Sequence, residues 1–266
     1  MLESILLGLI QGITEWLPVS SEGLVTASAT FLLDKSLEDA IGISLWLHLG
    51  TALAALLSFK VEILKLTKGF IGNPSCLKGE IGFLFLGTAV SALIGLPLLL
   101  FAGEIFQSDP TKNGTQIFTA LIGIFMIVTG VILLRSKRTG KRKRNDSGTI
   151  DAMLTGTAQG FSVLPGLSRS GLTVSVLLAR GMDRRDALTL SFLLSIPAAI
   201  GASLYTVFSS GIILSPEHFV AVGVSFITGL VTIRILLKLA DRINFGIFVI
   251  SVGTLLASNI VFASLI

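Results

Sequence analysis

The sequence is poor in charge and in cysteine, and each shortage excludes a class of protein. Only 14% of the 266 residues are charged, whereas soluble domains average about 25%. A soluble domain is therefore excluded, and the 52% of hydrophobic residues indicates a membrane protein that crosses the bilayer several times. The single cysteine, Cys76, excludes an internal disulfide, and no cluster of cysteine and histidine suggests zinc.

Long apolar segments predict the membrane spans. A helix needs about 20 apolar residues to cross a bilayer. Two further stretches, 2–31 and 149–180, are apolar but broken by glycine, proline and polar residues. Broken backbone at membrane depth is tolerated only inside protein or beside a water-filled cavity. We therefore expect an all-α integral membrane protein, a single domain over 1–266, with two re-entrant helical hairpins and six transmembrane helices at 40–60, 81–102, 116–135, 185–208, 217–237 and 243–265.

The basic residues are distributed unevenly between the loops. Alternate loops hold 17 of the 20 lysine and arginine residues. The first of these basic loops starts at residue 60 and contains Lys60, Lys65, Lys68 and Lys78, and the largest group is the run 135–144. Such loops lie on the cytoplasmic side, so 136–148 is expected to be a basic cytoplasmic loop and both termini to be extracytoplasmic. The run could also bind nucleic acid or anionic lipid, but the topological interpretation fits every other loop, and we expect no nucleic-acid partner.

The two broken stretches resemble each other at an offset of 147 or 148 residues. Gln11-Gly12, Leu17-Pro18 and Ser21 match Gln159-Gly160, Leu164-Pro165 and Ser168. Each half, 1–135 and 149–266, contains one hairpin and three spans. An odd number of spans leaves the chain on the opposite side of the membrane, so the second half is expected to be inverted relative to the first. Inverted repeats with broken helices place their site near the midplane, which would bring Glu15 and Ser21 toward Arg169.

The run from Pro165 to Thr173 has the composition of an anion site. Arginine grips phosphate oxygens with a planar fork, and glycine lets the backbone approach a ligand closely. A helix N-terminus with hydroxyl groups adds further donors. An apolar protein with this motif is expected to handle a phosphate carried on a lipid. The candidate binding residues are Gly166, Ser168, Arg169, Ser170 and Thr173.

Other polar residues allow both a functional and a structural interpretation. Ionisable groups in membrane segments are costly and usually functional, so Glu15, which shares a helical face with Gln11, is a candidate, although it could simply pair with Arg169. Glu22 is either a site residue or a solubilising charge at the hairpin tip. A lone histidine such as His48 is more often packed than catalytic. Thr173 could instead bond to its own helix.

The first motif, from Gln11 to Gly23, together with Pro165 to Thr173, resembles the undecaprenyl-diphosphatase family, also called the bacitracin-resistance family. The resemblance covers nearly the whole chain. It implies a multi-pass enzyme of the cell membrane that hydrolyses a polyprenyl diphosphate to the monophosphate and phosphate with a divalent cation, Mg²⁺ or Ca²⁺. In bacteria this recycles the lipid carrier of peptidoglycan synthesis, supports cell-wall biogenesis and confers antibiotic resistance.

The resemblance also assigns roles to matching positions. It implies that Gln11 and Glu15 correspond to the family's Glu/Gln-x-x-x-Glu pair and that Ser21 corresponds to a proposed nucleophile. Arg169 would act in catalysis, with Gln11, Ser20, Ser168, Ser170 and Thr173 binding the diphosphate. Two positions depart from the pattern: Leu24 replaces a common histidine, and Glu22 replaces a small polar residue.

The expected mechanism is electrostatic. Arg169 and a divalent cation would neutralise charge on the transferring phosphoryl group. Glu15 would either bind that ion or remove a proton from Ser21 or water. The rival function is a transporter that flips a polyprenyl phosphate with little or no hydrolysis, because inverted repeats also serve alternating access. The expected partners are the lipid substrate and membrane lipid; a homodimer is a further candidate that the sequence does not decide.

Overall fold

Helices joined by short turns make up the part of the chain that the structure describes. This computed structural model describes residues 1–72, 79–107, 112–135, 140–209, 215–239 and 245–258. The helices, in chain order, are α1 (Leu2–Thr14), α2 (Ser21–Leu33), α3 (Leu37–Ser58), α4 (Lys60–Gly72), α5 (Gly79–Gln107), α6 (Lys112–Arg135), α7 (Thr149–Phe161), α8 (Arg169–Ala179), α9 (Arg184–Ser209), α10 (Pro216–Leu239) and α11 (Phe245–Ala257), with a 3₁₀ turn, η1 (Arg144–Asp146).

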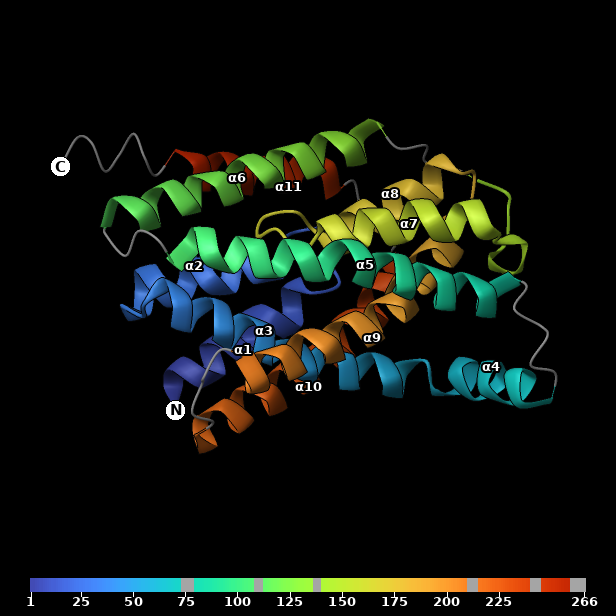
Figure 1. The fold of residues 1–266 in the computed structure, drawn as a ribbon, viewed down its shortest axis with the longest axis horizontal. Coiled ribbons are helices and arrows are strands. Elements are labelled where there is room, and N and C mark those ends of the chain that lie inside the picture. Colours follow the sequence, from blue (N-terminus) through green and yellow to red (C-terminus); the bar gives the residue numbers. More distant parts are fainter. Residues whose placement is uncertain (73–78, 108–111, 136–139, 210–214, 240–244, 259–266) are drawn as a thin grey trace.

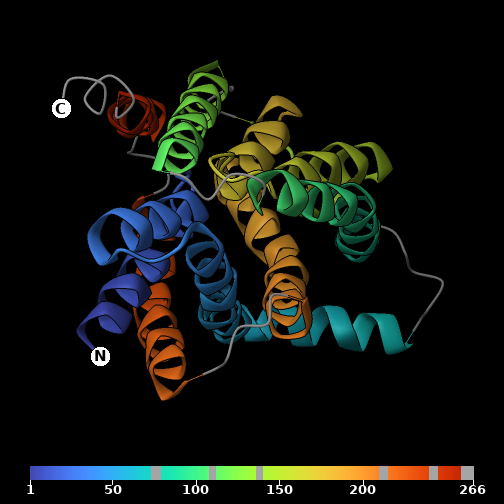
Figure 2. The same cartoon turned by 60° about the vertical axis from the view of Figure 1, so that its left-hand side comes forward.

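Five helices are long and apolar enough to cross a membrane, namely α3, α5, α6, α9 and α10. Each of them overlaps one of the predicted spans. The sixth prediction, 243–265, covers α11, but residues 243–244 and 259–265 lie outside the described part. The stretch that follows residue 60 was expected to be a basic loop, and this was wrong. It forms α4, none of whose residues is buried, and which runs along the side away from α6 and α11 (Figures 1 and 2).

The two broken stretches form two pairs of short helices, α1–α2 and α7–α8. Proline follows the first helix of each pair, at Pro18 and Pro165, and it cannot supply an N–H to continue a helix. Serine then opens the second helix: the oxygen of Ser20 accepts from the N–H of Gly23, and that of Ser168 caps α8. Polar interruptions in the sequence therefore end one helix and start the next.

Glycines let the first helix of each hairpin lie directly against a long helix. A Cβ on Gly12 of α1 would lie 2.7 Å from the carbonyl oxygen of Ser225 in α10. A Cβ on Gly160 of α7 would lie 2.7 Å from the Cβ of Ile94 in α5. Close backbone approach through small residues is the usual way that helices associate in lipid. The hairpins are thereby fixed on opposite sides of the α3–α9 pair (Figure 2).

The described part of the basic loop is fastened to the second hairpin. Asp151, in the first turn of α7, accepts from Nη2 of Arg142 at 2.7 Å and from Nε of Arg180 at 2.7 Å. Burial alone would raise the pKa of Asp151, but these two arginines and the N–H of Gly148 outweigh it and lower the pKa to about 2. The loop is therefore docked by a buried carboxylate.

Candidate functional site

The two hairpins meet at their turns, and their serine caps join them. The hydroxyl oxygen of Ser20 accepts from the N–H of Gly23 at 3.1 Å and from the N–H of Gly166, in the opposite turn, at 3.1 Å. The hydroxyl of Ser168 donates to the carbonyl of Val19 at 3.2 Å. Buried backbone groups in an apolar medium need partners, and each turn supplies some of the partners of the other.

The caps also correct the register of the repeat. The sequence comparison matched Ser21 with Ser168, but the residue that occupies the cap position of α2 is Ser20. With Ser20 equivalent to Ser168, the first residues of α2 and α8 correspond, and these are Ser21 and Arg169.

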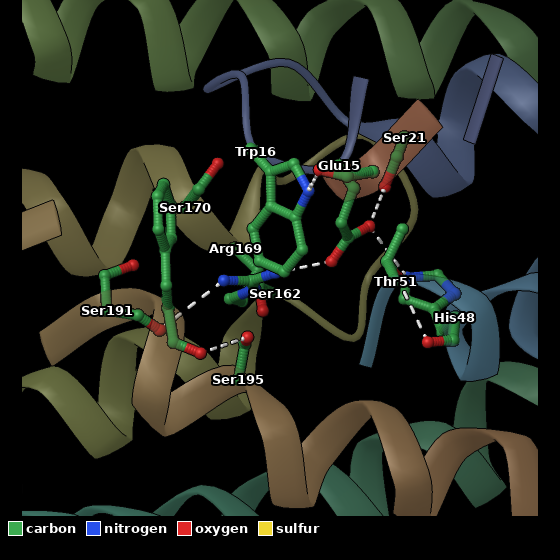
Figure 3. A network of polar contacts seen from close by, with 12 residues as sticks. Glu15, Trp16, Ser21, His48, Thr51, Ser162, Arg169, Ser170, Ser191 and Ser195 are labelled. Carbon is green, nitrogen blue, oxygen red and sulfur yellow. Dashed lines mark hydrogen bonds and ion pairs between the residues drawn. The ribbon is translucent and has the colours of Figure 1, made fainter. Parts of the chain in front are cut away.

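Four side chains converge on the buried carboxylate of Glu15, at the end of α1, and Ser21, His48 and Arg169 are labelled among them in Figure 3. Its Oε2 accepts from Nε2 of Gln11 at 2.9 Å and from Oγ of Ser21 at 2.6 Å. Arg169 donates to Oε1 in an ion pair. The Nε2 of His48 lies 3.4 Å from Oε2. The expected approach of Glu15, Ser21 and Arg169 is thus present, and His48 from α3 joins them.

The guanidinium of Arg169 is held on its other sides as well. It lies 5.7 Å from the ring centroid of Trp16, a cation–π distance. Its Nη1 contacts the carbonyl of Ser191 in α9 at 3.5 Å. The indole of Trp16 is fixed in turn, because its Nε1 donates to the carbonyl of Gly229 at 3.1 Å. The arginine is therefore oriented before any ligand arrives.

Glu15, Ser21, His48 and Arg169 line a cavity of about 110 Å³, which has room for several waters or a small anion. Apolar side chains of α5 and α9, such as Leu99 and Ala202, complete the wall. The polar lining comes from both hairpins, α3 and α9: Glu15, Ser20, Ser21, Glu22, His48, Gln159, Ser162, Ser168, Arg169, Ser170 and Ser195.

Three predicted binding residues stand behind the cavity wall. Gln11 is fully buried and reaches Glu15. Gly166 adopts a φ of +100°, and a Cβ there would lie 2.6 Å from the carbonyl oxygen of Ile122. Thr173 donates to the carbonyl of Arg169 at 2.8 Å, which is the helix-bonded alternative considered from the sequence. These three residues therefore support the residues that line the cavity and do not line it themselves.

Several lining or supporting residues were missed from the sequence. Trp16 follows Glu15 directly, and an aromatic beside an intramembrane acid was an available signal. Gln159 was noted only as the repeat counterpart of Gln11. Ser191 and Ser195 look like ordinary hydroxyls of an apolar span, so no sequence signal distinguishes them. Leu24, where the family commonly has histidine, packs beside the apolar cluster of Val19, Phe118 and Ile122.

The carboxylates differ in their capacity to hold a cation. Both oxygens of Glu15 already accept from protein donors. The carboxylate of Glu22 lines the cavity, and among the described residues none donates a hydrogen bond to it. No group of three or more metal-binding side chains occurs in the described part of the chain. The donor set therefore fits an ion bound by one carboxylate plus phosphate oxygens, as Mg²⁺ commonly is.

Comparison with known proteins yields one family. The family described as "Bacitracin resistance protein BacA" matches residues 4–257. The undecaprenyl-diphosphatase of Methanococcoides burtonii is 40% identical over 262 residues, which is 95% of this chain and 96% of that protein. The undecaprenyl-diphosphatases of Methanopyrus kandleri and Haloarcula marismortui are 39% and 36% identical, over 91% and 92% of this chain and 90% and 92% of their own lengths.

Proposed function

The chain belongs to the bacitracin resistance protein family, and we propose that it hydrolyses undecaprenyl diphosphate to the monophosphate and inorganic phosphate. The name of its relatives specifies this substrate. One observation carries the proposal: Arg169 and the Glu15–Ser21 pair meet in a single cavity inside an apolar helical protein. That arrangement supplies an anion clamp beside a hydroxyl that an adjacent carboxylate orients.

Arg169 is the charge-neutralising group of the proposed site. Phosphoryl transfer passes through a transition state with charge on the equatorial oxygens, so positioning and electrostatics supply most of the catalysis. The guanidinium is held by Glu15, Trp16 and Ser191, and a preoriented donor needs little reorganisation during the reaction. The nucleophile is Ser21 or a water bound near it.

Glu22 is the residue that we expect to hold a divalent cation, together with phosphate oxygens of the substrate. Its carboxylate faces the cavity, while the oxygens of Glu15 are engaged. When bound, such an ion supplies positive charge to the phosphoryl oxygens. Glu15, the earlier candidate ligand, instead orients Ser21 and Arg169.

The prenyl tail requires an apolar surface next to the polar cavity. A groove of about 540 Å³ runs between α6, α7 and α8, lined by residues that include Ile132, Ala158 and Val176. Leu167 lines both this groove and the polar cavity. We assign the groove to the first isoprene units, because a lipid whose diphosphate lies in the cavity can continue past Leu167 without crossing a polar surface.

An inverted repeat of 1–135 and 149–266 is the arrangement that best accounts for the hairpins. Gly8 and Gly12 pack α1 onto α10, and Gly156 and Gly160 pack α7 onto α5, at an offset of 148 residues in each case. The mutual serine caps follow the same offset. With the basic loops on the cytoplasmic side, both termini are extracytoplasmic, the hairpins are re-entrant, and the protein resides in the cell membrane. A homodimer is compatible with this arrangement.

Phosphate release tests the function directly. Purified protein in detergent is given undecaprenyl diphosphate with Mg²⁺, Ca²⁺ or EDTA, and Glu15→Ala and Arg169→Ala are assayed in parallel. Cation-dependent release that both substitutions abolish supports the proposal. The rival flippase is not favoured by the relatives' name. It would be supported if folded wild-type protein moved labelled polyprenyl phosphate across vesicles and released no phosphate.

A further inference from the structure

His48 presents one ring nitrogen to the candidate site and anchors the other. Its Nδ1 lies 2.8 Å from the carbonyl oxygen of Ser44, one turn earlier in α3. A carbonyl only accepts, so Nδ1 carries the proton and Nε2 of the neutral ring has a free lone pair. The hydrogen bond made by one ring nitrogen of a histidine thus determines whether the other nitrogen can accept a proton. The available nitrogen here is Nε2, on the cavity side.

That nitrogen shares a single oxygen with the hydroxyl of Ser21. Oε2 of Glu15 accepts from Oγ of Ser21 at 2.6 Å and lies 3.4 Å from Nε2 of His48. While the ring is neutral, Nε2 and Oε2 are both acceptors and make no hydrogen bond. Once Nε2 takes up a proton, it gains a carboxylate partner at once. The geometry therefore favours the arrival of a proton at this nitrogen.

We propose that His48 is the proton acceptor of the site, and this rests on the proposed phosphatase function. As Oγ of Ser21 bonds to the terminal phosphorus, the bond from phosphorus to the bridging oxygen breaks and the lipid monophosphate leaves. The hydroxyl proton passes by way of Oε2 of Glu15 to Nε2 of His48. Water then attacks the phosphoserine: one proton of that water leaves with the phosphate, the other is released to solvent, and the proton held on His48 returns to Ser21.

Glu15 is a poor final acceptor, because its ion pair with Arg169 stabilises the charged carboxylate. Three charged or titratable groups line the cavity together with the imidazole, namely Glu15 from α1, Glu22 from α2 and Arg169 from α8. The α9 side of the cavity presents serine and alanine, and no described α10 residue lines it.

The test separates proton acceptance from packing. In His48→Asn the amide nitrogen occupies the place of Nδ1 and keeps the bond to Ser44, but no group replaces Nε2. We expect kcat for phosphate release from undecaprenyl diphosphate to fall about 100-fold, the usual lower bound for general base catalysis. The wild-type decline in kcat at acidic pH, where histidine takes up its proton, should vanish in the variant, and imidazole should partly restore His48→Ala. The matched control is His218→Gln, because His218 contacts Ser215 outside the cavity.

The outcomes are distinct. Near-wild-type kcat in folded His48→Asn would overturn the proposal, as would a uniform loss with an unchanged pH profile and no imidazole rescue. Absence of phosphate release from the wild type itself would overturn the phosphatase function instead.

Discussion

Ser21 and Arg169 occupy the same position, the first residue of a helix, in two hairpins that face each other, and both donate to the carboxylate of Glu15. The hydroxyl binds one carboxylate oxygen and the guanidinium binds the other. A single acid thereby sets the position of a candidate nucleophile relative to the group that neutralises phosphate charge.

Replacing Arg169 by lysine tests whether the planar fork matters beyond its charge. Lysine keeps the charge but cannot reach Glu15 and Ser191 together. We expect kcat for phosphate release to fall by about 100-fold or more, with the melting temperature retained. Arg234→Lys, on the exposed side of α10, is the matched control. A loss below threefold in Arg169→Lys would show that charge alone suffices.

The adjacent serines should separate stability from chemistry. Ser20→Ala removes a helix cap that also serves Gly166, so it should destabilise the fold by about 1 kcal/mol and lower the rate little. Ser21→Ala removes the hydroxyl bound to Glu15 and should lose phosphate release while melting near the wild-type temperature. Full activity in Ser21→Ala would assign the nucleophile to water.

Glu22→Gln tests the cation site. Removing the free carboxylate of the cavity should raise the Mg²⁺ or Ca²⁺ concentration needed for half-maximal phosphate release by roughly 10-fold, as a lost charge-assisted contact of about 1.4 kcal/mol would. Glu38→Gln, at an exposed site in α3, should leave the cation titration unchanged. An unaltered titration in Glu22→Gln would place the ion elsewhere.

Filling the apolar groove should affect long substrates selectively. Ala158→Trp would occupy space between α6, α7 and α8, so KM for undecaprenyl diphosphate should rise several-fold, while KM for a short-chain prenyl diphosphate should change little. Ile247→Trp, on the exposed side of α11, serves as the control. Equal effects on both substrates would mean that the tail does not enter the groove.

Acid should loosen the basic loop through Asp151. The pKa of this carboxyl is lowered to about 2 in the folded protein, so the folded state releases its proton more readily than the unfolded chain. Its stabilisation, about 2 kcal/mol, is complete above about pH 4 and is lost as pH falls toward 2. Asp151→Asn should melt earlier at neutral pH and show a smaller decline with acid. The control Asp34→Asn, at an exposed turn, should melt at the wild-type temperature at each pH. Wild-type melting of Asp151→Asn would show that the carboxylate does not hold the loop.

The sequence allowed much of this site to be predicted because its motifs carry local chemistry. Pro18 and Pro165 mark the breaks, and Glu15 and Arg169 are costly enough in a membrane to demand partners. Contacts between distant elements were not predictable. Nothing in the neighbourhood of His48 along α3 reveals that α1 places Glu15 beside it.

The prediction from sequence was wrong where the same local composition suits two different structures. The lysines of α4, spaced among apolar residues, suited a basic loop and an exposed helix equally, and the structure has the helix. The repeat register was uncertain by one residue because serines occur in succession at Ser20 and Ser21, and only the cap hydrogen bond distinguishes them.

The shared caps have a consequence for biogenesis. A nascent chain that has released only its first half has a hydroxyl at Ser20 whose second donor, Gly166, has not yet been translated. The carboxylate of Glu15 likewise lacks its ion-pair partner until Arg169 has been translated. The site therefore stays incomplete until the second hairpin has been made, and we expect a truncated product that ends before this hairpin to be inactive.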